Sequence, residues 1–140
     1  MPDVFTKEKR SHVMSRIRGS GNRDTELRII ALFRHYDITG WRRNARVFGK
    51  PDFVFPRERL AVFVDGCFWH RHKGCKFAYV PKSRLEFWLP KFQNNVARDR
   101  IVDRALRKSG WKILRIWECQ LSRKRWSRIT QRIARLRGAG

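Results

Sequence analysis

The stretch of sequence that decides the fold is residues 49–66, which read GKPDFVFPRERLAVFVDG. Two short apolar runs, residues 53–55 and 60–64, are separated by the turn-forming sequence Pro-Arg-Glu-Arg. This pattern predicts two β-strands that pair as a hairpin. Asp52 opens the first strand and Asp65 ends the second. A hairpin would therefore bring both carboxylates to the same open end of the sheet.

Helical patterns surround the hairpin. Asp24 is a candidate N-cap for a helix that ends between residues 36 and 40. Residues 66–81 show no hydrophobic period and predict an irregular loop. Beyond this loop, Ser83-x-x-Glu86 is a candidate capping box, and Pro90 permits a fresh helix start. One face of the helix that follows carries Phe92, Val96, Val102 and Leu106, together with Asp99.

The last third of the chain adds one strand and one helix. Gly110 predicts the end of the preceding helix, and residues 111–117 read as a buried strand. Ser122 is a candidate cap for a last amphipathic helix. The order predicts a single α/β domain with a mixed central β-sheet flanked by helices. Residues 1–23 are polar and basic and predict an arm ahead of a domain of residues 24–140.

The charge of the chain points to a polyanionic partner. Lys and Arg number 34 against 12 Asp and Glu, which gives a formal net charge of +22 over 140 residues. Nucleic acid is the leading partner, because neutralising phosphates releases counterions. A solvated cationic surface and an anionic membrane, which the basic C-terminal helix would contact, are the alternatives. No long apolar run or secretory signal is present, and three cysteines make a poor disulfide framework, so we expect a reducing cytoplasm.

A group of Cys and His residues predicts a metal site in the irregular loop. The local spacing is Cys67-x4-His72-x2-Cys75, and Cys119 lies 44 residues further on. Thiolates and imidazole are ligands that structural Zn²⁺ prefers, and zinc would order a loop that lacks a core of its own. His70 could replace His72 as the fourth ligand, and the spare histidine is then a candidate general base. Free buried cysteines with a surface histidine are the alternative.

Four acidic residues predict a second metal site, which would suit a hard cation. Asp52 and Asp65 at one sheet end suit Mg²⁺, which prefers oxygen ligands, and Glu26 on the first helix could reach the same place. Asp99 lies on an apolar face, where a histidine partner would offset the cost of burying its charge. Turn residues or salt bridges to the many arginines are the alternative for each acid.

Aromatic residues lie in irregular, charged segments next to these sites. Phe68 and Trp69 belong to the loop, and Phe87 and Trp88 precede Pro90. Such side chains either stack on or wedge between nucleic-acid bases, or form a small hydrophobic cluster under the loop.

Taken together, these residues resemble the very-short-patch repair (Vsr) endonucleases. Five motifs occur in the order of that family: GKPDFV at 49–54, GCFWH at 66–70, EFWL at 86–89, NVxRDR at 95–100 and WEC at 117–119. The resemblance extends from about residue 10 to residue 121. It implies the PD-(D/E)xK restriction-endonuclease-like fold with a zinc-bound loop. It also implies an enzyme that nicks DNA on the 5′ side of the T in a T:G mismatch left by deamination of 5-methylcytosine.

The resemblance also implies roles for individual residues. Asp52 and the backbone carbonyl of Val64 would bind the catalytic Mg²⁺, and Glu26 would support the metal-bound waters. His70 would activate the attacking water, with Asp99 orienting it. The structural zinc ligands would be Cys67, His72, Cys75 and Cys119. The DNA-binding residues would be Phe68, Trp69 and Trp88 as intercalators, Met14 in the arm on the minor-groove side, and Lys91 and Asn95 near the mismatched bases.

Two features depart from the family pattern. Asp65 and Val64 stand where well-known members carry histidine and threonine, so Asp65 is itself a candidate Mg²⁺ ligand. Two residues separate His72 from Cys75, one more than the shortest family spacing.

Three hypotheses follow from the sequence. The first is a T:G mismatch endonuclease acting on double-stranded DNA, monomeric, nucleoid-associated and followed by downstream repair proteins. The second is the same nuclease centre acting on another mismatch, a modified base or a restriction site. The third is a non-catalytic, zinc-stabilised nucleic-acid-binding module.

Overall fold

The computed structural model describes residues 23–138. The basic arm predicted over residues 1–23, including Met14, lies outside this range apart from its last residue. The boundary between arm and domain therefore stays a prediction.

A four-stranded mixed sheet forms the centre of the molecule. The strands are β1 (Arg42–Arg43), β2 (Phe53–Phe55), β3 (Leu60–Asp65) and β4 (Lys112–Trp117), in the spatial order β1-β2-β3-β4. β2 and β3 pair antiparallel, which confirms the predicted hairpin, whereas β3 and β4 pair parallel. The predicted α/β class with a mixed sheet is confirmed.

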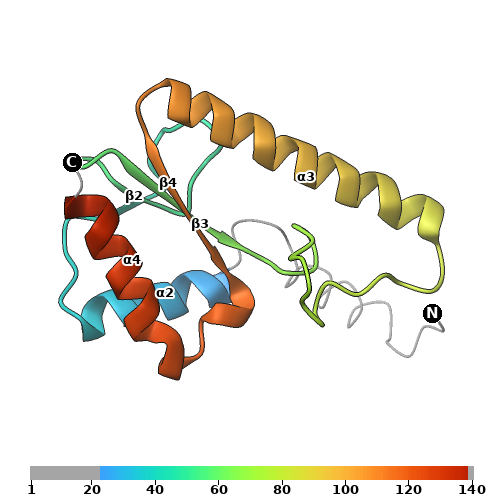
Figure 1. Ribbon diagram of the computed structural model, residues 1–140, viewed down its shortest axis with the longest axis horizontal. Coiled ribbons are helices and arrows are strands. Elements are labelled where there is room, and N and C mark those ends of the chain that lie inside the picture. Colours follow the sequence, from blue (N-terminus) through green and yellow to red (C-terminus); the bar gives the residue numbers. More distant parts are fainter. Residues whose placement is uncertain (1–22, 139–140) are drawn as a thin grey trace.

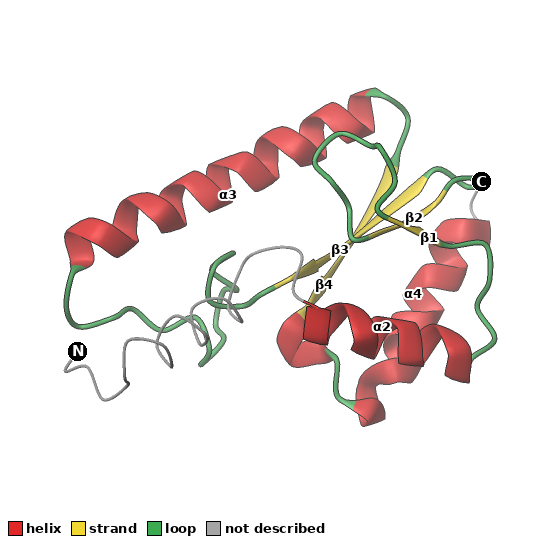
Figure 2. Ribbon diagram, turned by 180° about the vertical axis from the view of Figure 1, so that it is seen from behind, coloured by secondary structure: helices red, strands yellow, loops and turns green. Residues whose placement is uncertain are grey.

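Helices cover both faces of the sheet. α2 (Arg23–His35) and α4 (Trp126–Gly138) lie on one face, and the long α3 (Leu85–Lys108) crosses the other (Figure 1). The view from behind shows the same three layers (Figure 2). Two short 3₁₀ turns, Glu118–Gln120 and Arg123–Arg125, connect β4 to α4. Among the described residues, no helix is long and apolar enough to cross a membrane.

The alternation of side chains along β3 separates two cores. Leu60, Val62 and Val64 pack with α2 and α4 in the larger cluster, whereas Ala61 and Phe63 pack with α3 in the smaller one. Because side chains alternate between the faces of a strand, Asp65 must follow Phe63 onto the α3 face. The sheet thereby directs this carboxylate toward α3.

The predicted end of α3 before Gly110 is confirmed, but the three predicted helix starts are wrong. Asp24 lies inside α2, which begins at Arg23. Ser122 is the N-cap of the 3₁₀ turn at Arg123–Arg125, without a side-chain cap hydrogen bond, while α4 begins only at Trp126.

The start of α3 also differs from the prediction. The structure has no capping box at Ser83: the N-cap is Arg84 in the left-handed conformation, without a side-chain cap hydrogen bond, and Pro90 lies inside the helix. The stacking of Trp88 on Phe92, with ring centroids 6.0 Å apart, anchors the turn ahead of the proline. Aromatic packing therefore extends the helix five residues before Pro90.

Gly49 and Val102 set the distance between α3 and the hairpin. Gly49 has a φ of +83°, and a Cβ added there would lie 2.4 Å from Val102 Cγ1. We expect Gly49→Ala to lower the free energy of unfolding by about 2–4 kcal/mol, because backbone strain and overpacking add. The matched control is Gly110→Ala, which has a φ of +88° but only Arg59 side-chain atoms nearby; it should cost about 1–2 kcal/mol. Equal losses in denaturant titrations would contradict the close packing.

Candidate functional site

A polar pocket opens on the α3 face of the sheet at the end of β3. Its volume is about 290 Å³. The residues that line it come from the segment before β2, from β3 and the loop that follows β3, from α3 and from β4. They are Gly49, Asp52, Phe63, Asp65, His70, Asn95, Arg98, Asp99, Val102 and Arg115. The pocket thus collects four of the acidic or histidine residues that the sequence singled out.

Asp52 is fixed at the floor of this pocket. Its side chain Oδ2 accepts a hydrogen bond from the backbone N–H of Val64 at 2.7 Å, and the residue is 8% exposed. The Asp52 carboxylate therefore adds one hydrogen bond to β3 next to the backbone hydrogen bonds between β2 and β3. This contact also holds the backbone of Val64 next to the Asp52 carboxylate.

His70 and Asp99 form a hydrogen-bonded dyad beside Asp52. After β3 the chain turns back on itself, with the His70 N–H donating to the Gly66 carbonyl at 3.1 Å. His70 Nδ1 lies 2.5 Å from Asp99 Oδ2 on α3. Because an ionised carboxylate only accepts, we assign the proton to Nδ1, which leaves Nε2 as the basic nitrogen. This arrangement suits a general base held by a carboxylate.

Arg115 on β4 neutralises Asp65. The carboxylate of Asp65 is buried, and its two oxygens accept from Arg115 Nη1 at 3.0 and 2.9 Å. Burial raises the pKa of Asp65, and the charges of His70 and Arg115 offset part of the rise. Asp65 is thus a counterion of Arg115 in this structure. Sequence reasoning missed Arg115, although a cation inside a buried strand signals an acidic partner.

Glu26 lies apart from the His70–Asp99 dyad. It pairs with Arg43 at 2.6 Å and lines a second hollow of about 670 Å³. Asp52 borders both hollows. Glu26 therefore shares one hollow with Asp52, whereas His70 shares the other.

The parallel pairing of β3 and β4 builds a Cys/His cluster. Asp65 pairs with Trp117, so Cys67 and Cys119 stand at equivalent places beyond the two strand ends. A ligand atom from each of Cys67, His72, Cys75 and Cys119 lies within 4.8 Å of the others. Four nitrogen and sulfur donors at this separation could hold one metal ion, and the set fits tetrahedral Zn²⁺.

Burial disfavours the thiolate form of two of the three cysteines in this cluster. Burial raises the pKa of the Cys67 thiol to about 12, and burial also raises the pKa of Cys119. At Cys75, burial acts in the same direction, but hydrogen bonds to the Phe77 backbone and to the other two thiols outweigh it and lower the pKa. The His72 ring stacks on Trp117 with centroids 4.2 Å apart, which fixes its orientation. A bound cation would stabilise the thiolates that burial disfavours.

Arg71 stabilises the same loop, and the sequence did not predict this role. Its guanidinium donates to the carbonyls of Phe68, Ala78 and Tyr79 and lies 4.0 Å from the centroid of the Phe92 ring. The side chain of Arg71 therefore orders the predicted irregular loop, in addition to the Cys/His cluster. An arginine among 34 cationic residues gives no sequence signal of its own.

The predicted DNA-contacting aromatics pack against one another. Phe68 is buried, and its ring lies 5.5 Å from that of Trp69, 5.3 Å from Trp88 and 5.1 Å from Phe92. Trp69 Nε1 is buried without a hydrogen-bond partner among residues 23–138. On α3, Lys91 is exposed with its ammonium 4.8 Å from the Phe87 ring, and Asn95 donates to its carbonyl at 3.0 Å.

The pocket also fits a hard divalent cation by its chemistry. Asp52, Asp65 and Asp99 are among the residues that line it. Carboxylate oxygens are the ligands that Mg²⁺ prefers, and the buried sheet edge offers them without a competing thiolate in the pocket lining.

Comparison with known proteins decides the family. Residues 2–76 match the family model described as DNA mismatch endonuclease Vsr. The DNA mismatch endonuclease Vsr of Escherichia coli is 41% identical over 123 residues, which cover 86% of this chain and 76% of the relative. The chain belongs to the Vsr family of DNA mismatch endonucleases.

Two further relatives match over a similar length. The type II nicking enzyme V.XorIIP of Xanthomonas oryzae is 38% identical over 122 residues, 87% of this chain and 88% of the relative. V.NmeAIP of Neisseria meningitidis, also named a type II nicking enzyme, is 38% identical over 125 residues, 89% and 87% respectively. Membership of the Vsr family makes the chain a DNA endonuclease and rules out the non-catalytic binding module as its class.

The Cys/His cluster makes a prediction about metal content. We expect His72→Ala to lower bound zinc from about one ion per chain to near zero and the melting temperature by about 5 °C or more. The matched control is His35→Ala, an exposed histidine on α2 outside the cluster, which should keep its zinc. Elemental analysis and calorimetry measure both quantities. Full zinc content in the His72 variant would contradict the ligand assignment.

Proposed function

We propose that this chain is a Mg²⁺-dependent endonuclease that nicks double-stranded DNA on the 5′ side of the T in T:G mismatches. The observation that carries the proposal is the His70–Asp99 hydrogen bond, which lies in the same polar pocket as Asp52. Family membership supplies the class of substrate. We assign Mg²⁺ to Asp52 and the Val64 carbonyl, and Zn²⁺ to the Cys/His cluster.

His70 and Asp99 activate the attacking water. Nε2 of His70 takes a proton from a water molecule, and the oxygen of that water attacks the phosphorus while the P–O3′ bond breaks. The leaving O3′ takes up a proton from solvent. The products are a 5′-phosphate and a 3′-hydroxyl. Asp99 keeps the ring oriented and stabilises the imidazolium that forms. Bound Mg²⁺ supplies neutralisation of the charge that develops on the phosphate. Glu26, which lines a second hollow together with Asp52, orients water there.

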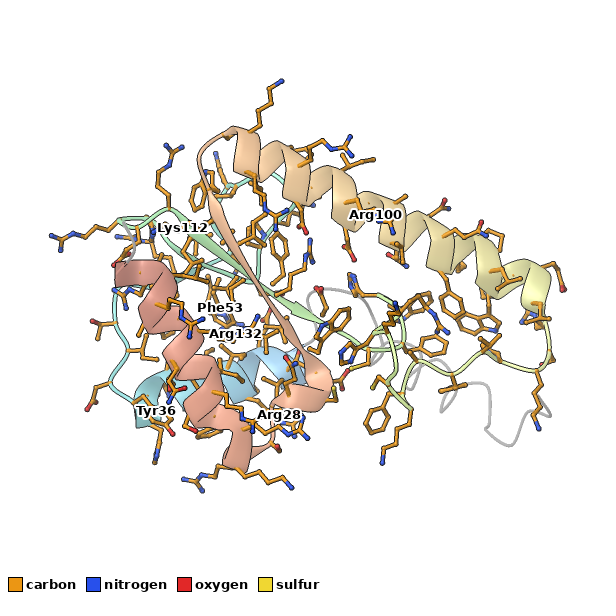
Figure 3. All side chains as sticks on the ribbon, in the orientation of Figure 1. Arg28, Tyr36, Phe53, Arg100, Lys112 and Arg132 are labelled. Atoms are coloured by element: carbon orange, nitrogen blue, oxygen red, sulfur yellow. The ribbon has the colours of Figure 1, made fainter. Side chains whose placement is uncertain are left out.

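The basic surface supplies the DNA contacts. Cationic side chains such as Arg28 on α2, Arg100 on α3 and Arg132 on α4 occur on both faces of the sheet (Figure 3). We assign Lys91 and Asn95, one turn apart on α3, to the mismatched bases, and Met14 in the arm of residues 1–23 to the minor groove. Phe68, Trp69 and Trp88 would leave their mutual packing to wedge beside the mismatch.

The proposal also includes the location, the oligomeric state and the repair partners of the enzyme. A nick in chromosomal DNA needs downstream repair proteins, so we place the enzyme in the cytoplasm with the nucleoid. We propose that it acts as a monomer. The second candidate is the same centre acting on another mismatch or site, which the several nicking enzymes among the relatives favour.

The target and the metal are tested together. On a panel of duplexes that differ only at the central pair, with and without Mg²⁺, we expect nicking of the T:G duplex alone. Asp52→Ala should reduce nicking by about 10³-fold or more, because several kcal/mol of charge stabilisation are lost. The variant should keep its zinc and its duplex binding. Undiminished nicking by the variant, or cutting without Mg²⁺, would contradict the proposal, and cutting of another duplex alone would favour the second candidate.

The role of Asp99 has its own test. Asp99→Asn keeps the shape but removes the acceptor that holds the Nδ1 proton of His70, so we expect a fall in the single-turnover nicking rate of about 10²–10⁴-fold. Glu86→Gln neutralises an exposed acid on the same helix and serves as the control. Equal rates for the two variants would exclude the dyad from catalysis.

A further inference from the structure

Arg115 is a cation built into the wall of the catalytic pocket. It lies on β4 opposite Phe63 of β3, and its guanidinium is 4.3 Å from the centroid of that ring. Its Nε donates to Asp103 at 3.0 Å and its Nη2 to the same carboxylate at 2.6 Å. Two of the three guanidinium nitrogens are thus bound to one carboxylate, so the position of the group is fixed.

The remaining nitrogen of Arg115 faces the other acids of the pocket. Nη1 donates to both oxygens of Asp65 and lies 3.7 Å from Asp99 Oδ1. Asp65 and Asp99 also converge on His70 Nδ1, at 4.0 and 2.5 Å. One positive group therefore stands between two carboxylates that would otherwise repel each other in a poorly solvated place.

The same acids have the geometry of a cation site. Ligand atoms of Asp65, His70 and Asp99 all lie within 4.8 Å of one another. Two carboxylates at this spacing, of which Asp65 is buried and Asp99 half-buried, are stabilised by a cation or a proton between them. In this chain the guanidinium of Arg115 supplies the positive charge, and this group is part of the protein itself.

We propose that Arg115 takes the place of a second divalent cation. Arg115 binds Asp65 as an ion-pair partner, and this carboxylate is then not available as a metal ligand. The pocket is thereby limited to one divalent ion, at Asp52. Arg115 is a positioning residue, because it acts through Asp65 and Asp99. This inference rests on the proposed divalent-ion site, and it gives Asp65 a different role from the ligand that the sequence suggested.

The test counts Mn²⁺ ions on the zinc-loaded protein by equilibrium dialysis. We expect one Mn²⁺ per wild-type chain and two per Arg115→Met chain. The net charge of +22 disfavours loose binding elsewhere. The matched control is Arg98→Met, which removes an exposed cation from the same pocket and should still bind one ion. Arg115→Met combined with Asp65→Asn should return the count to one. If Arg115→Met does not fold, Arg115→Gln removes the charge and keeps an amide donor for Asp103.

The outcomes separate this inference from the proposed function. One ion on both the wild type and the Arg115 variant overturns the inference and leaves the proposed function intact. No ion on the wild type but one on the variant supports the inference and overturns the site at Asp52. No ion on either protein overturns both. Anomalous diffraction from Mn²⁺ in crystals of the variant should place the added ion between Asp65 and Asp99, and any other location would contradict the inference.

Discussion

The parallel pairing of β3 with β4 is the constraint on which both candidate metal centres depend. Its register aligns Asp65 with Trp117, so the chain leaves both strands at one end of the sheet. Cys67 and Cys119 then stand side by side and close the Cys/His cluster. On the α3 face, the same pairing sets Arg115 against Asp65. The loop that carries the cluster also brings His70 to Asp99, so the Cys/His cluster, the His70–Asp99 dyad and the Arg115–Asp65 ion pair share one structural origin.

Elements with a strong local signal were predictable from the sequence. The hairpin residues have a β-forming pattern bounded by Pro and Asp, and the structure reproduces β2 and all of β3 with one added residue. Gly110 has the positive φ that ends a helix, as its position indicated. The two polar groupings also follow from sequence, because strand ends bring residues together even when their side-chain contacts are unknown.

Features that depend on tertiary contacts were not predictable. β1 has only Arg42 and Arg43, which show no hydrophobic alternation, and it exists because it pairs with β2. The extension of α3 before Pro90 depends on aromatic packing across the helix. Arg71 donates to carbonyls within eight residues of itself, but one arginine among 34 cationic residues gives no signal of its own. A cation in the strand at Arg115 signals an acidic partner, but the sequence does not say which acids lie beside it, because Asp65 and Asp103 come from other elements.

Imidazole nitrogen NMR of the zinc-loaded protein, repeated after zinc is removed by chelation, tests most directly whether the metal-tied loop presents His70 to Asp99. The account predicts a slowly exchanging His70 Nδ1–H with an unprotonated Nε2 in the loaded protein, and loss of that protected proton once zinc is gone. A proton on Nε2 in the loaded protein, or an Nδ1–H signal unchanged by zinc removal, would contradict the account.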